Sequence, residues 1–191
     1  MMTHRRSGQG FTLIELMITL AIAAILMVVA VPNFTAYKRN AELTSAANTL
    51  LAAINAARGE AMKRSMYAMV VPTDAAIWNN GLVVFTDKDR SQTYTSNTDQ
   101  TVLTQAALPS YLTISGTGTA GLGTPYILFD GSGYPKSKAG GFGVLTLTIT
   151  RTDLSGTTLA EQTRRLIIST SGRARVCKPS TDTTCLSIAT Q

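Results

Sequence analysis

The chain opens with a sharp change from a basic segment to a long apolar one. Residues 1–10 carry Arg5 and Arg6 and end in glycine. The 21 residues from Phe11 to Val31 are almost all apolar, and as a helix they would extend about 31 Å, enough to cross a hydrocarbon core of about 30 Å. Since basic residues favour the cytoplasmic side, we expect the rest of the chain to lie outside. Glu15 interrupts the apolar segment, and a carboxylate there usually has a functional partner.

A second helical pattern follows the apolar segment. Between Tyr37 and about Ser65, small and aliphatic residues recur every three or four positions and form one apolar stripe: Leu43, Ala47, Leu50, Ile54, Ala57 and Ala61. Proline is absent from Asn33 to Val71. The pattern predicts one helix of about 50 residues, with its first half in lipid, its second half packed on a domain, and a kink or loosened turn at Pro32.

The remainder of the chain is rich in Thr, Ser, Gly and β-branched residues. Short apolar runs bounded by turn residues predict strands: Tyr67–Val71, Leu82–Phe85, Tyr111–Ser115, Tyr126–Phe129, Val144–Thr150 and Arg164–Thr170. Val144–Thr150 alternates strictly, so we expect one buried and one wet face. Gly116–Gly121 matches GxGxxG, but another strand follows it in place of a helix, so we expect a loop there. Helix first and strands after predict an α+β fold with an antiparallel sheet against the helix.

Composition argues against catalysis. The only histidine is His4, in the basic segment, so Ser-His-Asp, Cys-His and HExxH sites are excluded from the rest of the chain. The acidic residues are scattered. Asp87-Lys88-Asp89 is similar to the start of a calcium loop, but Gln92 and Thr98 stand where glycine and glutamate are required. We therefore predict no enzyme, no cofactor and no metal site.

Two cysteines, Cys177 and Cys185, are the only ones in the chain. No histidine or further cysteine can complete a zinc set with them. In an exported domain, an even count at short spacing predicts one disulfide, and two free thiols are the alternative.

The junction Gly10-Phe11-Thr12-Leu13-Ile14-Glu15, followed by the apolar segment, resembles the class III leader junction of type IV pilins and type II secretion pseudopilins. The resemblance implies that prepilin peptidase cuts between Gly10 and Phe11 and that Phe11 is N-methylated. It also implies that Glu15 pairs with the N-terminal amine of an adjacent subunit during assembly with other pilins and minor pilins.

Three later segments resemble the GspH/FimT branch of this family. They are Trp78–Asp87 with its tryptophan, glycine and aspartate, Phe129–Gly133, and Ile167–Arg175, which ends in Gly-Arg-Ala-Arg. We interpret the first two as structural: a packed indole and tight turns. The implied organisation is a leader at 1–10, a transmembrane and assembly half-helix at 11–34, an amphipathic half-helix at 35–66, and a β-rich head at 67–191 with a disulfide-pinned tail.

Positive charge is concentrated near the C-terminus. From Arg151 to Gln191 there are six basic and three acidic residues. Arg173 and Arg175 are two apart, so on a strand both would point to one side, as an arginine fork for phosphates. Gly-Arg-x-Arg at this position resembles the DNA-binding motif of FimT-like minor pilins. That resemblance assigns nonspecific binding of double-stranded DNA to Arg173 and Arg175, and we add Lys178 as a weaker contact.

The leading hypothesis is therefore a minor type IV pilin that takes up extracellular DNA in natural transformation. The resemblance implies a Gram-negative bacterium, anchorage in the inner membrane with the head in the periplasm, and an extracellular pilus after assembly. The alternatives are a purely structural FimU-like minor pilin of the priming or tip complex and a GspH-like minor pseudopilin of type II secretion.

Overall fold

A single long helix, α1, runs from Leu13 to Arg64 in the computed structural model, which describes residues 10–186. Its 52 residues confirm the predicted length, and it is continuous through Pro32. The helix ends in a Schellman-type cap, in which Ser65 adopts a φ of 52° and Met66 N–H donates to the Ala61 carbonyl at 3.2 Å. The leader residues 1–9, with His4, Arg5 and Arg6, lie outside the described range.

The chain divides into two compact units, Met1–Asn40 and Ala41–Gln191. In the first unit the large apolar side chains of α1 are exposed, among them Leu13, Leu20 and Ile25. By length and composition α1 could cross a membrane, and its most apolar 18-residue window is entirely unburied. A helix with this composition requires an apolar environment such as lipid or neighbouring helices.

The second unit contains two antiparallel sheets. The five-stranded sheet has the order β3-β2-β1-β5-β6, and the four-stranded sheet has the order β4-β7-β8-β9. The strands are β1 (Ala68–Pro72), β2 (Leu82–Thr86), β3 (Gln100–Gln105), β4 (Leu112–Gly116), β5 (Ile127–Phe129), β6 (Pro135–Lys136), β7 (Leu145–Arg151), β8 (Arg164–Ile168) and β9 (Ala174–Cys177). Short helices lie between some of them: η1 (Trp78–Asn80), η2 (Gly118–Gly121) and α2 (Gly156–Glu161).

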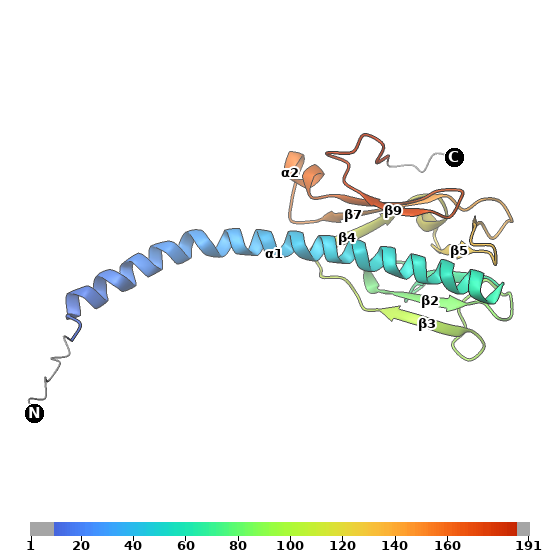
Figure 1. Cartoon of the computed structure of the whole chain (residues 1–191), viewed down its shortest axis with the longest axis horizontal. Coiled ribbons are helices and arrows are strands. Elements are labelled where there is room, and N and C mark those ends of the chain that lie inside the picture. Colours follow the sequence, from blue (N-terminus) through green and yellow to red (C-terminus); the bar gives the residue numbers. More distant parts are fainter. Residues whose placement is uncertain (1–9, 187–191) are drawn as a thin grey trace, which may run out of the picture. The chain divides into compact units, whose positions relative to one another are not determined.

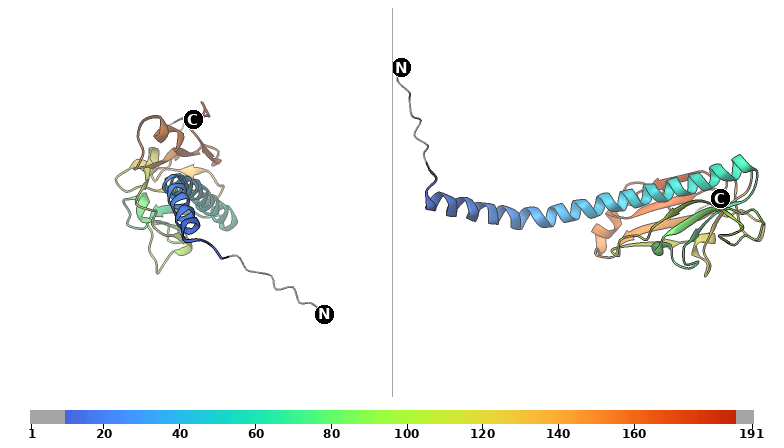
Figure 2. Two further views of the ribbon diagram at one scale, coloured as in Figure 1. Left: turned by 90° about the vertical axis from the view of Figure 1, so that its left-hand side faces the viewer. Right: turned by 90° about the horizontal axis from the view of Figure 1, so that it is seen from below.

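Both sheets pack on the second half of α1. In Figure 1, β2 and β3 lie on one side of this half and β7 and β9 on the other, and Figure 2 shows the same half against the sheets in both views. The predicted apolar stripe supplies the helix side of the core: Leu43, Ala47, Leu50, Ile54, Ala57 and Ala61 are all buried. Burying one Leu or Ile side chain contributes roughly 1.5–3 kcal/mol, so this stripe fixes which face of α1 the sheets cover.

The observed fold confirms the α+β class and extends the strand prediction. All six predicted strands form, but β3, β6, β9 and α2 were not predicted, and the strands divide into two sheets instead of one. In β7, Leu145, Leu147 and Ile149 face the core as the alternation requires, yet Thr146 is also fully buried. Thr117 covers the backbone at this position: its N–H donates to the Thr146 carbonyl, and its hydroxyl accepts from the Thr146 N–H.

Candidate functional site

The start of α1 carries the predicted cleavage and assembly residues. Gly10 and Phe11 precede the helix, and the Phe11 side chain is 87% exposed. Thr12 N–H and the Thr12 hydroxyl both donate to Glu15 Oε2 at 3.0 Å, and Glu15 N–H donates back to Thr12 Oγ1 at 3.3 Å. This reciprocal arrangement is a capping box. This capping box was not predicted, although its signature, Thr-x-x-Glu before an apolar run, is present in Thr12–Glu15.

The capping box gives Glu15 a partner within its own chain. It also marks the start of the helix at Leu13, so that the peptide bond between Gly10 and Phe11 lies outside the helical hydrogen-bond pattern. Glutamine can also complete such a box, since it offers the same acceptor oxygen without the charge. Capping and charge pairing at Glu15 are therefore chemically separable.

The turn between β8 and β9 presents Arg173. Ser169 N–H donates to the Arg173 carbonyl at 3.1 Å, and Gly172 closes the turn with a φ of 76°. A side chain at Gly172 would collide with the carbonyl of Gly133, so only glycine fits this close approach. Arg173 itself is exposed, and its side chain makes no hydrogen bond or ion pair within residues 10–186.

Arg58 of α1 holds this turn in place. Its Nε donates to the Gly133 carbonyl at 3.0 Å and its Nη2 to the Ser171 carbonyl at 3.1 Å. The guanidinium therefore ties together the second half of α1, the loop after β5, and the turn that carries Arg173. A planar guanidinium suits this task because it directs several donors in fixed directions.

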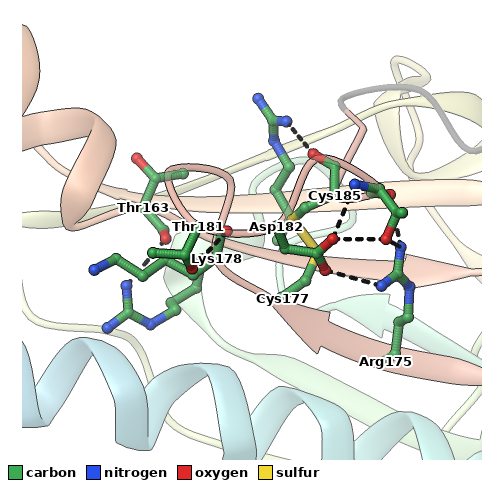
Figure 3. Close-up of a disulfide and its surroundings, with 10 residues drawn as sticks. Thr163, Arg175, Cys177, Lys178, Thr181, Asp182 and Cys185 are labelled. Carbon is green, nitrogen blue, oxygen red and sulfur yellow. Dashed lines mark hydrogen bonds and ion pairs between the residues drawn. A yellow bond between two sulfur atoms is a disulfide. The ribbon is translucent and has the colours of Figure 1, made fainter.

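Arg175 has a different environment from Arg173. It lies within β9, its Nη1 contacts Asp182 Oδ2 at 3.1 Å, and its Nη2 donates to the Thr184 carbonyl at 2.6 Å (Figure 3). Hydrogen bonds from the Thr184 hydroxyl and backbone, with Arg175 beside them, lower the pKa of Asp182. Arg173 precedes β9, and Arg175 is engaged by the loop, so the structure does not leave both guanidinium groups free for the predicted fork.

The C-terminal loop is closed by a disulfide, which confirms the predicted pairing of Cys177 with Cys185. Arg165 of β8 also anchors this loop, because its Nη1 donates to the Cys185 carbonyl at 2.6 Å. Lys178 lies on the opposite side of the disulfide from Arg175 in Figure 3. The three predicted DNA-binding residues thus have three different surroundings, and Arg173 is the one exposed at the turn.

Three carboxylates form a separate cluster around the loop after β2. Asp87 and Asp99 are buried and Asp89 is exposed, with oxygen atoms within 4.8 Å of one another. Asp87 accepts from the N–H groups of Ser91 and Gln92, and Asp99 accepts from those of Lys88 and Thr95. Burial, together with the neighbouring carboxylates, raises the pKa of Asp87. These bonds shape the loop, and we assign no metal to it.

The segment Trp78–Asp87 contains the packed indole and the tight turn that the sequence predicts. Trp78 is 4% exposed, and its indole N–H donates to the Ala120 carbonyl at 3.0 Å. That carbonyl belongs to η2, within the GxGxxG segment, which therefore packs against the indole. Gly81 follows with a φ of 99° and forms the tight turn into β2.

Comparisons with known proteins agree with this architecture. The prokaryotic N-terminal methylation motif matches residues 5–31, and the model of the type II transport protein GspH matches residues 46–172. No curated protein matches the chain.

Two crystal forms of the type IV minor pilin FimU from Pseudomonas aeruginosa have a similar fold, with TM-scores of 0.56 and 0.54. The identities are 20% and 18%, and the matches cover 75% and 72% of this chain and 94% of FimU in each case. The two family matches place a methylation-type pilin N-terminus ahead of a GspH-type head, and the GspH match spans more than half of the chain. The protein therefore belongs to the GspH family of minor pilins and pseudopilins.

Proposed function

We propose that this protein is a minor type IV pilin that binds DNA through its head. The observation that carries the proposal is Arg173, an exposed guanidinium without an internal partner within residues 10–186, on a turn made rigid by Arg58 and Gly172. A charge held in this way can contact a phosphate without first breaking an internal ion pair. Contacts of this kind are independent of sequence and weaken as salt concentration rises.

Arg175 and Lys178 are secondary in this proposal. Arg175 reaches a phosphate fully only when DNA displaces Asp182, because its terminal nitrogens are engaged by the loop. Lys178 lies on the other side of the disulfide from Arg175 in Figure 3, so we expect the two to contact different phosphates. We therefore expect Arg173 to contribute most of the affinity and a single subunit to bind weakly.

The proposed route of assembly depends on the N-terminal part of the chain. In this proposal prepilin peptidase cuts between Gly10 and Phe11 and the Phe11 amine is methylated. α1 then anchors the subunit in the inner membrane, with its head in the periplasm, until it joins other pilins. The match to the N-terminal methylation motif and the exposed apolar face of α1 support this sequence of events. Mass spectrometry of the purified protein tests it: the expected N-terminus is Phe11 carrying one methyl group.

The DNA hypothesis is tested with full-length protein in detergent micelles. Binding to a fluorescent duplex is measured by anisotropy at low and increasing salt, for the wild type and for Arg173→Ala, Arg175→Ala and Lys178→Ala. We expect Arg173→Ala to weaken binding most and to reduce the slope of log K against log salt by about 0.9, the value for one phosphate contact. Equal binding by the wild type and Arg173→Ala, or no binding by either, would refute the proposal.

A purely structural minor pilin is the second candidate. The ion pair of Arg175 with Asp182 favours it, because this arginine already has a role in holding the C-terminal loop. Under this alternative, Arg173→Ala assembles normally and changes neither DNA binding nor transformation. A role in type II secretion would appear as a defect in protein export when the gene is deleted.

A further inference from the structure

A groove with aromatic and aliphatic walls lies at the same end of the four-stranded sheet as Arg173. It has a volume of about 820 Å³, and its lining residues include Leu122, Tyr126, Lys138, Phe142 and Val144. Val144 directly precedes β7, whose first residue pairs with Ile168 at the end of β8, and the turn bearing Arg173 follows Ile168. The groove and the turn therefore belong to one end of the head.

Two apolar side chains that line the groove are open to solvent. Phe142 is 57% exposed and Leu122 is 52% exposed. An exposed phenyl ring beside an exposed aliphatic side chain is costly in water unless something covers it. The backbone at Phe142 is held in place, since it forms an isolated antiparallel bridge with Lys136 of β6. An exposed aromatic ring on an anchored backbone can stack with a planar ligand.

Cations surround the aromatic rings of this groove. Lys136 Nζ lies 4.8 Å from the centre of the Phe142 ring and 3.7 Å from Asp130, and Lys138 Nζ lies 4.9 Å from the centre of the Tyr126 ring. Lys138 is exposed and makes no ion pair within the described part of the chain. None of the residues that line the groove is acidic. The groove thus suits a ligand that combines a flat apolar ring with negative charge.

We propose that this groove binds an unpaired base of single-stranded DNA, with the base stacked at Phe142 and its phosphates near Lys138 and Arg173. The inference rests on the proposed DNA binding and specifies the form of DNA that the head prefers. In a duplex the base faces are already stacked, so Phe142 has nothing to contact there. Stacking on an aromatic side chain is tolerant of sequence because every base has a π face.

The test compares two DNA probes on full-length protein in detergent micelles. One is a single-stranded oligothymidylate of about 12 nucleotides, and the other is a duplex of the same length. We expect the wild type to bind the single strand more tightly than the duplex. Phe142→Ala should weaken single-strand binding about fivefold or more, as expected for the loss of one stacked base, and leave duplex binding unchanged. Phe142→Trp should restore it.

Ile77→Ala is the matched control, because Ile77 is 52% exposed and does not line the groove. The inference is overturned, and the proposed function kept, if duplex binding depends on Arg173 while Phe142→Ala binds the single strand like the wild type. It is also overturned if Phe142→Ala keeps full single-strand affinity but no longer enters pili, since the groove is then a contact between subunits. Absence of binding to either probe overturns the proposed function and this inference together.

Discussion

Removal of the disulfide should destabilise the head measurably. The bond joins residues eight positions apart, and the loop-entropy relation for a loop of this length gives about 2.5 kcal/mol at 25 °C. For a unit of this size, such a loss lowers the melting temperature by about 5–10 °C. Both sulfur-bearing residues are buried, at 8% and 3% exposure for Cys177 and Cys185, so serine hydroxyls in their places add a further desolvation cost.

The assay uses the only tryptophan of the chain. Trp78 is buried in the core of the second unit, so its fluorescence reports unfolding of the head while the first half of α1 remains in a detergent micelle. The double variant Cys177→Ser/Cys185→Ser should unfold at a lower urea concentration than the oxidised wild type. Wild type treated with reductant should behave like the double variant, and the double variant itself should not respond to reductant.

The polar contacts of the loop should contribute far less than the disulfide. The ion pair of Arg175 with Asp182 is about one-third exposed on each side, and pairs of this kind are typically worth about 0–1 kcal/mol. Arg175→Ala in the oxidised protein should therefore shift the unfolding free energy by less than about 1 kcal/mol. If the double serine variant unfolds at the same urea midpoint as the oxidised wild type, the entropic reasoning is wrong. If Arg175→Ala has the larger effect, the polar contacts hold the loop instead.

Two further predictions concern carboxylates. If the charge of Glu15 pairs with an N-terminal amine, the Glu15→Gln variant should keep the capping box but fail to enter pili, whereas the Glu15→Ala variant should lose both the cap and the charge pair. A pilus-shearing assay measures incorporation of each variant. Normal incorporation of Glu15→Gln with failure of Glu15→Ala would show that capping is the whole role of Glu15. Asp87 has a raised pKa in the folded protein, chiefly through burial, so its protonated form stabilises the fold below about pH 4 and this contribution is lost as pH rises through the raised pKa. The unfolding free energy of wild type minus that of Asp87→Asn should therefore fall from acid to neutral pH; a flat difference would show that Asp87 titrates normally.

Local patterns were sufficient for the first half of the chain. The 3.6-residue period of the apolar stripe from Leu43 to Ala61 identified the buried face of α1, because a helix hydrogen-bonds within itself and its length and faces can be read from consecutive residues. The same holds for the end of the helix near Ser65. The capping box at Thr12–Glu15 is local in the same way, because its signature is Thr-x-x-Glu before an apolar run.

Tertiary structure decided what the head presents. Strand β3 is mostly polar and β9 has only four residues, so their pairing with β2 and β8 depends on partners that their own pattern does not specify. Arg173 and Arg175 look equivalent in sequence, yet one is exposed on a turn while the other is engaged by Asp182 and Thr184. Nothing in the sequence around Phe142 indicated that its ring is exposed on a groove.

The sequence alone therefore determined the cleavable-leader resemblance, the long helix and the α+β class, since these depend on short-range patterns. The division into two sheets, the different surroundings of the two arginines and the open groove beside Phe142 were decided only by the folded chain. The physical reason is that burial and ion pairing depend on which segments meet in space. Residues as far apart as Arg58, Gly133 and Ser171 meet only after α1 and both sheets have packed together.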